Sequence, residues 1–170
     1  MRIIQWKTYL ADALFRRFFG VAPGTRLLDV GCGARQLVLI AARAGTKVRG
    51  CDISVNWLEK ARERATAEGL ELILEEGDAE PLTYEDAQFD TVVILIAAMF
   101  APRPDLVAAE LTRVCRPGGI IAMANWTPGG FVGQMFKTIG RHIAPSGMPS
   151  PVQWGMKSRF ASVSAKGLPI

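Results

Sequence analysis

The sequence predicts an α/β protein with a doubly wound, mostly parallel Rossmann-like sheet of strand order 3-2-1-4-5 and helices on both faces. Short apolar runs alternate with segments of helical periodicity from residue 26 to about residue 143, and this alternation is typical of βαβ units. The run over residues 89–97 is almost continuously apolar, as expected of a central parallel strand that is covered on both faces. A chain of 170 residues corresponds to about one domain.

Each expected strand is a short apolar run that ends at a turn. The five runs cover residues 26–30, 48–53, 70–76, 89–97 and 120–126. Helices are expected between them over residues 36–44, 54–68 and 105–115, and a last helix from residue 131 to about residue 142, whose apolar side chains at residues 131–139 fall on one face. Gly45 and Gly69 end the first two helices, Ser54 suits an N-cap, and Pro104 suits a first turn.

We expect three regions along the chain. Residues 1–20 have the spacing of an amphipathic helix that packs on the domain as a cap, with a helix on a membrane surface as the alternative. Residues 21–143 form the α/β domain. Residues 144–170 hold four prolines and five serines, so we expect an irregular tail in which only residues 159–165 suit a short strand.

Composition narrows the classes of partner. The net charge of +4 comes from scattered arginines, which argues against nucleic acid binding. No stretch approaches about 18 consecutive apolar residues, and the N-terminus lacks the apolar core of a signal peptide, so we expect a cytoplasmic protein without stable membrane insertion. The three cysteines have no metal-ligand spacing, so we expect reduced, buried thiols and no metal site.

Glycines and carboxylates follow three of the expected strands. The first strand ends in Asp29-Val30-Gly31-Cys32-Gly33, where glycine lets the backbone turn sharply and approach a ligand. Asp52 ends the second strand 21 residues after Gly31, a spacing at which a carboxylate accepts both ribose hydroxyls. The alternative role for Asp52 is a carboxylate at the N-terminus of the next helix. Residues 76–80 follow the third strand and supply a carboxylate for the amino group of adenine.

These segments resemble the motifs of class I S-adenosylmethionine-dependent methyltransferases, in the small-molecule branch that includes ubiquinone/menaquinone-type enzymes. The resemblance covers about residues 25–143 and is carried by five motifs in order. They are Leu28-Asp29-Val30-Gly31-Cys32-Gly33, Gly50-Cys51-Asp52-Ile53, Glu76-Gly77-Asp78-Ala79, Phe89-Asp90-Thr91-Val92-Val93 and Leu111-Thr112-Arg113-Val114-Cys115-Arg116-Pro117-Gly118-Gly119.

The resemblance implies roles for the matching positions. Gly31 and Gly33 would line the methionine part of the cofactor, and Asp29 would orient that loop and the amino group. Asp52 would hold the ribose hydroxyls, while Asp78 and Ala79 would hold the adenine. The end of the fourth strand would face the sulfonium and the acceptor. The full set of expected S-adenosylmethionine-binding residues is Asp29, Gly31, Cys32, Gly33, Asp52, Ile53, Asp78, Ala79, Glu80, Leu95, Ile96 and Ala97.

Two features depart from the family pattern. Arg35 stands where the third glycine of the first motif is usual, so we expect a weaker cofactor affinity or an Arg35 side chain that turns outward. The antiparallel hairpin that completes the family's sheet is missing or incomplete after residue 144, so the chain is apparently short at its C-terminus. Residues 120–126 would then form an open sheet edge that invites a homodimer.

The hypothesis that follows is methyl transfer to a small, apolar acceptor. The acceptor atom and the catalytic base stay open, since His142, Tyr84 and Glu85 have no assigned role. A truncated or degenerate cofactor-binding domain with little catalysis is the alternative, suggested by Arg35 and the missing hairpin. An NAD-dependent oxidoreductase is a remote alternative, because its glycine motif needs Gly or Ala where this chain has Gln36.

Overall fold

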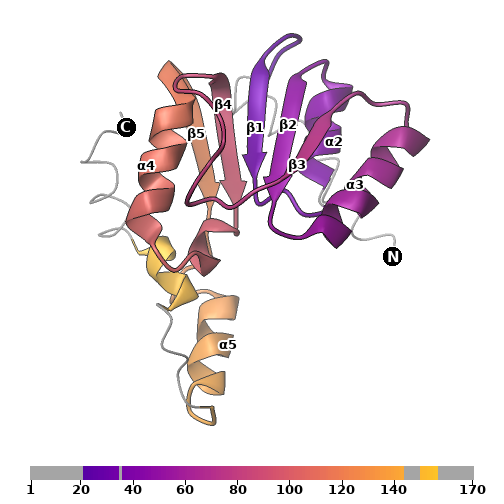
Figure 1. The fold of residues 1–170 in the computed structure, drawn as a ribbon. Coiled ribbons are helices and arrows are strands. Elements are labelled where there is room, and N and C mark those ends of the chain that lie inside the picture. Colours follow the sequence, from indigo (N-terminus) through magenta and orange to yellow (C-terminus); the bar gives the residue numbers. More distant parts are fainter. Residues whose placement is uncertain (1–20, 35, 144–149, 157–170) are drawn as a thin grey trace.

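The computed structural model describes residues 21–34, 36–143 and 150–156 (Figure 1). The expected cap helix over residues 1–20, Arg35 and most of the expected tail therefore lie outside the described residues.

One five-stranded sheet forms the centre of the domain. Its strands are β1 (Arg26–Val30), β2 (Lys47–Asp52), β3 (Ile73–Glu76), β4 (Phe89–Leu95) and β5 (Cys115–Ala124). Their order is β3-β2-β1-β4-β5, and every neighbouring pair is parallel. This confirms the predicted fold class, because the chain reverses its direction across the sheet between β3 and β4 as a doubly wound fold requires.

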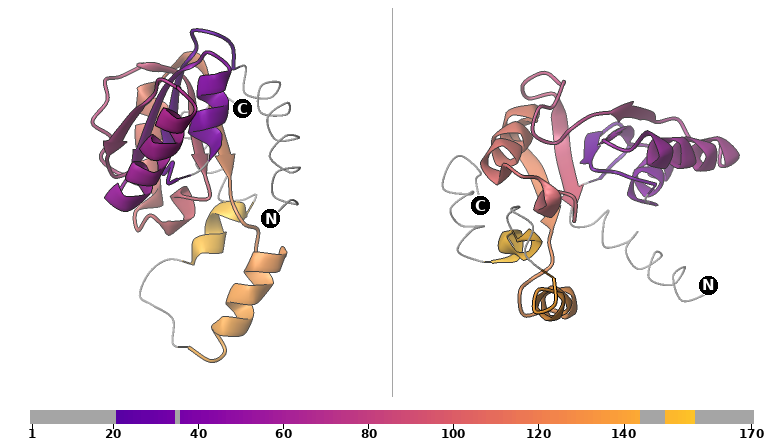
Figure 2. Two further views of the ribbon diagram at one scale, coloured as in Figure 1. Left: turned by 90° about the vertical axis from the view of Figure 1, so that its right-hand side faces the viewer. Right: turned by 60° about the horizontal axis from the view of Figure 1, so that its bottom comes forward.

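Helices cover both faces of the sheet. On one face lie α2 (Gln36–Arg43) and α3 (Val55–Ala67), and on the other lies α4 (Pro104–Val114) (Figures 1 and 2). Ser54 is the N-cap of α3 as predicted, although its side chain makes no capping hydrogen bond. Pro104 opens α4, where a missing N–H costs nothing.

Three strands, β3, β4 and β5, differ from the prediction by more than one residue at an end. β3 begins at Ile73 rather than at residue 70. β4 ends at Leu95 because Ile96 has a positive φ of 68°, which turns the chain out of the sheet. β5 begins at Cys115 rather than at residue 120, and Trp126 lies outside it. The strand passes through the expected break because Gly118 takes a φ of 73°, next to an irregularity in the β4–β5 register.

The core has two parts, one on each side of the sheet. The α2–α3 side is filled mainly by aliphatic side chains, including Leu27, Val38, Leu39, Leu58 and Val93. The α4 side includes Leu28, Val92, Ile94, Val107 and Leu111. All three cysteines are buried and unpaired, as predicted, and burial raises the pKa of Cys51 to about 12, so its thiol is neutral.

The segment after β5 extends beyond the carboxyl edge of the sheet. Helix α5 (Phe131–Ile139) begins where predicted, ends before His142 and projects away from the sheet (Figure 2). Its apolar face is not buried within the described structure. The side chain of Phe131 is 85% exposed. A short 3-10 helix, η2 (Pro151–Gly155), lies in the region expected to be irregular. Its Trp154 is buried in the α4-side core.

Asp90 joins three strands at their amino ends. Its carboxylate accepts hydrogen bonds from the backbone N–H and the guanidinium of Arg26 on β1, and from Nε of Arg116 on β5, at 2.7–3.1 Å. These donors lower the pKa of Asp90 well below its usual range, with the Arg26 side chain as the largest cause. A group with a lowered pKa stabilises the fold above its unfolded-state pKa, which is about 3.9 for aspartate.

We therefore expect Asp90→Asn to lower the free energy of unfolding by about 1–3 kcal/mol at pH 7, since a multiply hydrogen-bonded charge is lost. The difference between wild type and variant should shrink as the pH falls from 5 toward 2 (roughly the range over which a carboxylate of lowered pKa is protonated). Urea denaturation at several pH values measures both effects. Asp86→Asn is the control, because Asp86 is an exposed carboxylate with one arginine partner. An equal loss in both variants would contradict the role given to Asp90.

Candidate cofactor-binding site

A pocket opens at the carboxyl ends of the central strands, where a parallel sheet binds its ligands. Its volume is about 640 Å³, within the range of roughly 300–1,000 Å³ that small-molecule sites occupy. The segments that follow β1, β2, β3 and β4 all contribute to it, together with the first turn of α3. The lining residues are Gly31, Gly33, Ala34, Asp52, Ile53, Ser54, Trp57, Gly77, Asp78, Ala79, Ala97, Phe100, Ala101 and Pro102.

The glycine loop after β1 forms the floor of the pocket. Gly31 and Gly33 have positive φ values of 67° and 52°, which favour glycine. The Cα of Gly31 lies so close to Ala97 that a Cβ at residue 31 would overlap the Ala97 side chain. The N–H groups of Gly31 and Cys32 both donate to the carbonyl oxygen of Cys51, at 2.8 and 3.0 Å. The ends of β1 and β2 therefore hold the loop in one conformation.

Asp52 links the glycine loop to the start of α3. One carboxylate oxygen accepts the N–H of Gly33 at 2.8 Å, and the other accepts the N–H of Ser54 at 2.9 Å. The carbonyl oxygen of Asp52 accepts the N–H of Gly77 at 3.1 Å. Asp52 thus has the helix-terminal role that the sequence left open, and its half-buried carboxylate also lines the pocket. Each carboxylate oxygen keeps a further lone pair for a ligand hydroxyl.

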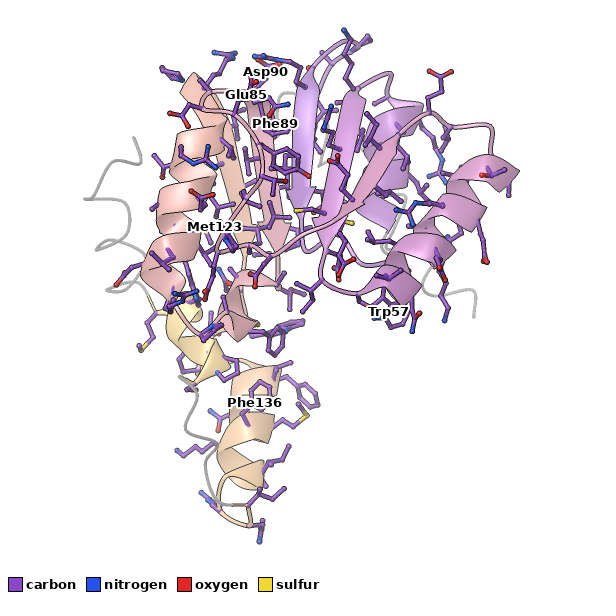
Figure 3. All side chains as sticks on the ribbon, viewed as in Figure 1. Trp57, Glu85, Phe89, Asp90, Met123 and Phe136 are labelled. Carbon is purple, nitrogen blue, oxygen red and sulfur yellow. The ribbon has the colours of Figure 1, made fainter. Side chains whose placement is uncertain are left out.

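The segment after β3 forms one side wall. Asp78 and Ala79 line the pocket, and Asp78 is exposed to it. Its Oδ1 accepts the N–H of Glu80 at 3.0 Å, which fixes the carboxylate against its own backbone. Exposed Ile53 and Trp57, which follow β2, also line the pocket. Figure 3 shows Trp57 at the end of α3 that faces the carboxyl edge of the sheet.

The segment after β4 forms the other side wall. Ile96 is held in its left-handed conformation by a hydrogen bond from its N–H to the Ala124 carbonyl, at 2.7 Å, and this backbone is unfavourable for a β-branched residue. The turn brings Ala97 against Gly31 and leads into the 3-10 helix η1 (Ala98–Phe100). Phe100, Ala101 and Pro102 then line the pocket with apolar surface.

The structure brings seven of the twelve predicted residues together on the pocket wall, namely Gly31, Gly33, Asp52, Ile53, Asp78, Ala79 and Ala97. The other five do not line it. Asp29 and Cys32 are buried beneath the loop, and Glu80 is buried beside Arg103. Leu95 and Ile96 pack toward the two parts of the core. These five residues lie beneath or beside the residues that line the pocket.

Sequence reasoning missed several cofactor-side residues of the wall. Trp57 lies in the first turn of α3, three residues after the N-cap Ser54. Because this helix was expected to begin at the carboxyl edge of the sheet, its first turn could have been predicted to line the pocket. The two larger residues of η1 differ in their placement. Met99 is buried in the core, whereas Phe100 is 56% exposed and lines the pocket.

The pocket offers few groups for acid–base chemistry. Among the described lining residues only Asp52 and Asp78 are ionisable. Tyr84 is buried and donates to Glu75 at 3.0 Å, and burial raises its pKa. His142 is exposed beyond the end of α5, and Glu85 lies in the β3–β4 connection. None of these three lines the pocket. The described walls are therefore built to bind and orient a ligand.

Fold and pocket together define an open-sheet α/β protein with a small-molecule pocket at the carboxyl ends of its parallel strands. Residues 28–123 match the family model described as a methyltransferase domain. The chain belongs to the class I S-adenosylmethionine-dependent methyltransferases, and its cofactor is S-adenosylmethionine. This assignment excludes the NAD-dependent oxidoreductase that the sequence left as a remote alternative.

Individual relatives agree with the family. An uncharacterized protein of Mycobacterium tuberculosis is 44% identical over 138 residues, which cover 80% of this chain and 50% of that protein. A phosphatidylethanolamine N-methyltransferase of Cereibacter sphaeroides is 39% identical over 107 residues, covering 61% of this chain and 52% of the relative. The chain thus spans about half the length of these curated relatives. The crystal structure of an S-adenosylmethionine-dependent methyltransferase from Aquifex aeolicus shares the fold, with a TM-score of 0.70 and 18% identity over 91% of this chain and 77% of that one.

The lining residues suit S-adenosylmethionine in their chemistry. Gly31 and Gly33 line the pocket without side chains, so a ligand chain could approach the backbone of the floor closely. Asp52 offers acceptors for the two ribose hydroxyls, and Asp78 offers one for the adenine amino group. Ile53 and Ala79 supply apolar surface between them for the adenine ring.

Proposed function

We propose that this chain transfers a methyl group from S-adenosylmethionine to a small, apolar acceptor. The observation that carries the proposal is the composition of the pocket, in which one wall bears two carboxylates and the other is formed by Phe100, Ala101 and Pro102. The carboxylate wall suits the hydroxyl and amino groups of the cofactor. The apolar wall suits an acceptor that loses water when it binds.

The residues of this chain would act by binding and orientation. When bound, the cofactor supplies a methyl group that is already activated, so no strong acid is needed for its departure. Gly31 and Gly33 let the backbone approach the methionine part, while Asp52 and Asp78 fix the ribose and the adenine. Phe100 and Ala97 would exclude water beside the acceptor and restrict its approach. Positioning and water exclusion of this kind account for much of a displacement's acceleration.

The apolar acceptor is supported by two further observations. The described pocket wall carries no cation that would pair with an anionic acceptor. The Cereibacter relative is named for phosphatidylethanolamine, a molecule with a large apolar part.

A Phe100→Ala variant tests the acceptor wall. We expect its affinity for S-adenosylhomocysteine to stay within about twofold of wild type, because that ligand has no acceptor part. Turnover of an apolar acceptor should fall about tenfold or more, since burial of an aromatic surface stabilises binding by roughly 1.5–3 kcal/mol. The measurements are calorimetry with S-adenosylhomocysteine and a screen with labelled methyl groups on apolar and charged acceptors. Leu106→Ala is the control, because Leu106 is an exposed apolar residue of α4 outside the pocket. Methylation of charged acceptors alone would contradict the proposal.

A binding domain with little catalysis is the second candidate. The chain spans half the length of its relatives, and α5 presents its apolar face to solvent within the described structure. Figure 3 shows α5 with Phe136 beyond the end of the sheet. Under this alternative the chain binds S-adenosylhomocysteine in calorimetry but transfers no label. Multiple turnovers by the 170-residue chain on any acceptor would reject it.

We also propose that the free edge of β5 pairs with a second copy of the chain. Within residues 21–34, 36–143 and 150–156, β5 has β4 on one side and no strand on the other. Apolar Ile120 is exposed on this strand, and an open apolar edge favours association. Sedimentation of the wild type should show a dimer, and Ile120→Lys should shift it toward monomer. A wild-type monomer at high concentration would contradict the homodimer.

A cytoplasmic location is proposed from the cysteines. All three thiols are unpaired, as suits a reducing compartment. Within the described residues no helix has the length and apolarity needed to cross a membrane.

A further inference from the structure

The two side walls of the pocket are joined behind the pocket by one buried carboxylate. Glu80 follows the wall residues Asp78 and Ala79, and its side chain is only 3% exposed. Its Oε1 accepts the backbone N–H of Arg103 at 2.6 Å, and its Oε2 accepts Nε of the same residue at 2.6 Å. Arg103 follows directly on Pro102, the last residue of the apolar wall. The contact therefore runs from one wall to the other.

The connection continues to the carboxylate that faces the pocket. The N–H of Glu80 donates to Oδ1 of Asp78 at 3.0 Å. Asp78, Glu80 and Arg103 thus form an unbroken series of hydrogen bonds from the adenine side to the acceptor side. A displacement of Arg103 would be transmitted to Asp78 through the backbone of Glu80.

The sequence around Arg103 leaves Glu80 one backbone N–H as a hydrogen-bond donor in this stretch. Pro102 and Pro104 have no N–H, so Arg103 supplies the one backbone donor of the stretch Pro102-Arg103-Pro104. Arg103 is also the N-cap of α4, where a carboxylate is stabilised by the helix dipole. A buried carboxylate without its partners is unfavourable, so the two hydrogen bonds of Glu80 favour the separation of the two walls at which they form.

We propose that Glu80 is a positioning residue that sets the distance between the cofactor wall and the acceptor wall. It was expected from the sequence to touch the cofactor, but it acts through Asp78 and Pro102 instead. The proposal rests on the proposed function for its ligand, and the geometry of the two walls is independent of that function.

Three variants test the proposal. Glu80→Ala removes both hydrogen bonds, and we expect the dissociation constant for S-adenosylhomocysteine to rise at least tenfold. Glu80→Gln keeps an oxygen for the N–H of Arg103, so it should rescue part of the affinity and show a rise of about threefold. Glu68→Gln is the matched control, because Glu68 pairs with Arg43 far from the pocket at 2.7 Å. The dissociation constants are compared at temperatures equally far below the unfolding midpoint of each variant. A general loss of stability is then not mistaken for a loss of affinity.

A second measurement does not depend on the cofactor. Amide hydrogen exchange of the ligand-free protein should rise at least threefold in peptides covering residues 77–82 and 100–106 of Glu80→Ala, and in neither peptide of Glu68→Gln. If the wild type binds no S-adenosylhomocysteine, the proposed function fails and the exchange result alone decides the role of Glu80. Wild-type exchange in both peptides of a folded Glu80→Ala would overturn the proposal, as would wild-type affinity in that variant.

Discussion

Replacing Gly31 with alanine is expected to abolish the binding of S-adenosylhomocysteine and to lower the free energy of unfolding by about 2–5 kcal/mol. Two costs add at this position. A side chain at a positive φ of 67° is unfavourable by about 1–2 kcal/mol. The new methyl group would also overlap the Cβ of Ala97, and overpacking of this kind costs about 1–3 kcal/mol. Relief of the overlap would move the glycine loop or the turn at Ala97, both of which line the pocket.

Gly69→Ala separates the two costs. Gly69 has a similar φ of 63°, and no atom lies within 4 Å of the position where its Cβ would stand. We expect this variant to lose about 1 kcal/mol of stability and to bind S-adenosylhomocysteine normally. Urea denaturation and calorimetry measure the two effects. Equal losses of stability in the two variants would show that Ala97 moves aside at no measurable cost. The close approach of Gly31 to Ala97 would then contribute nothing to the stability of the domain.

Replacing Asp52 is expected to have the largest effect on cofactor affinity of any side-chain change. Asp52→Ala removes the acceptors for the Gly33 and Ser54 N–H groups and the carboxylate that lines the pocket. We expect the dissociation constant for S-adenosylhomocysteine to rise about 100-fold, equivalent to about 3 kcal/mol. Hydrogen bonds to a charged group of about 1.5–3 kcal/mol account for a loss of this size.

Asp52→Asn gives the intermediate case, because its remaining oxygen still accepts one backbone N–H. We expect a rise of about tenfold, or about 1.4 kcal/mol. Glu76→Gln is the control, since Glu76 ends the neighbouring strand in register with Asp52 and does not line the pocket. Calorimetry with S-adenosylhomocysteine distinguishes the variants. If Asp52→Ala bound the ligand as tightly as Glu76→Gln, the ribose would not be held at the end of β2.

Local sequence was sufficient for most of the fold. The predicted strand over residues 26–30 is β1 to the residue, and the predicted last helix is α5, which begins at residue 131 as expected and ends at Ile139, before His142. Apolar runs bounded by glycine determine such elements without long-range information. The end of β4 and the start of β5 differ from the prediction because of the backbone conformations at Ile96 and Gly118. Apolar periodicity carries no signal for a positive φ at an isoleucine, so the end of β4 was placed too late.

The region after β5 shows a second limit. Prolines and serines predicted an irregular tail, but Trp154 is only 4% exposed and packs in the α4-side core. Its burial depends on residues far earlier in the chain, including Met99. A proline-rich composition predicts that regular backbone hydrogen bonds are lost, but it does not predict which side chains of the segment are buried against distant residues.

For the pocket, the sequence by itself determined which carboxylates and glycines stand at the carboxyl ends of the first three strands. Parallel strands end at one edge, so Gly31, Asp52 and Asp78 had to meet once the strands were known. Only the tertiary structure decided which neighbours of these residues face the ligand. Cys32 is buried beneath the loop and Glu80 is bonded to Arg103, 23 residues away. The direction of a loop side chain depends on the partner that it meets across space, and residue spacing along a loop does not specify that partner.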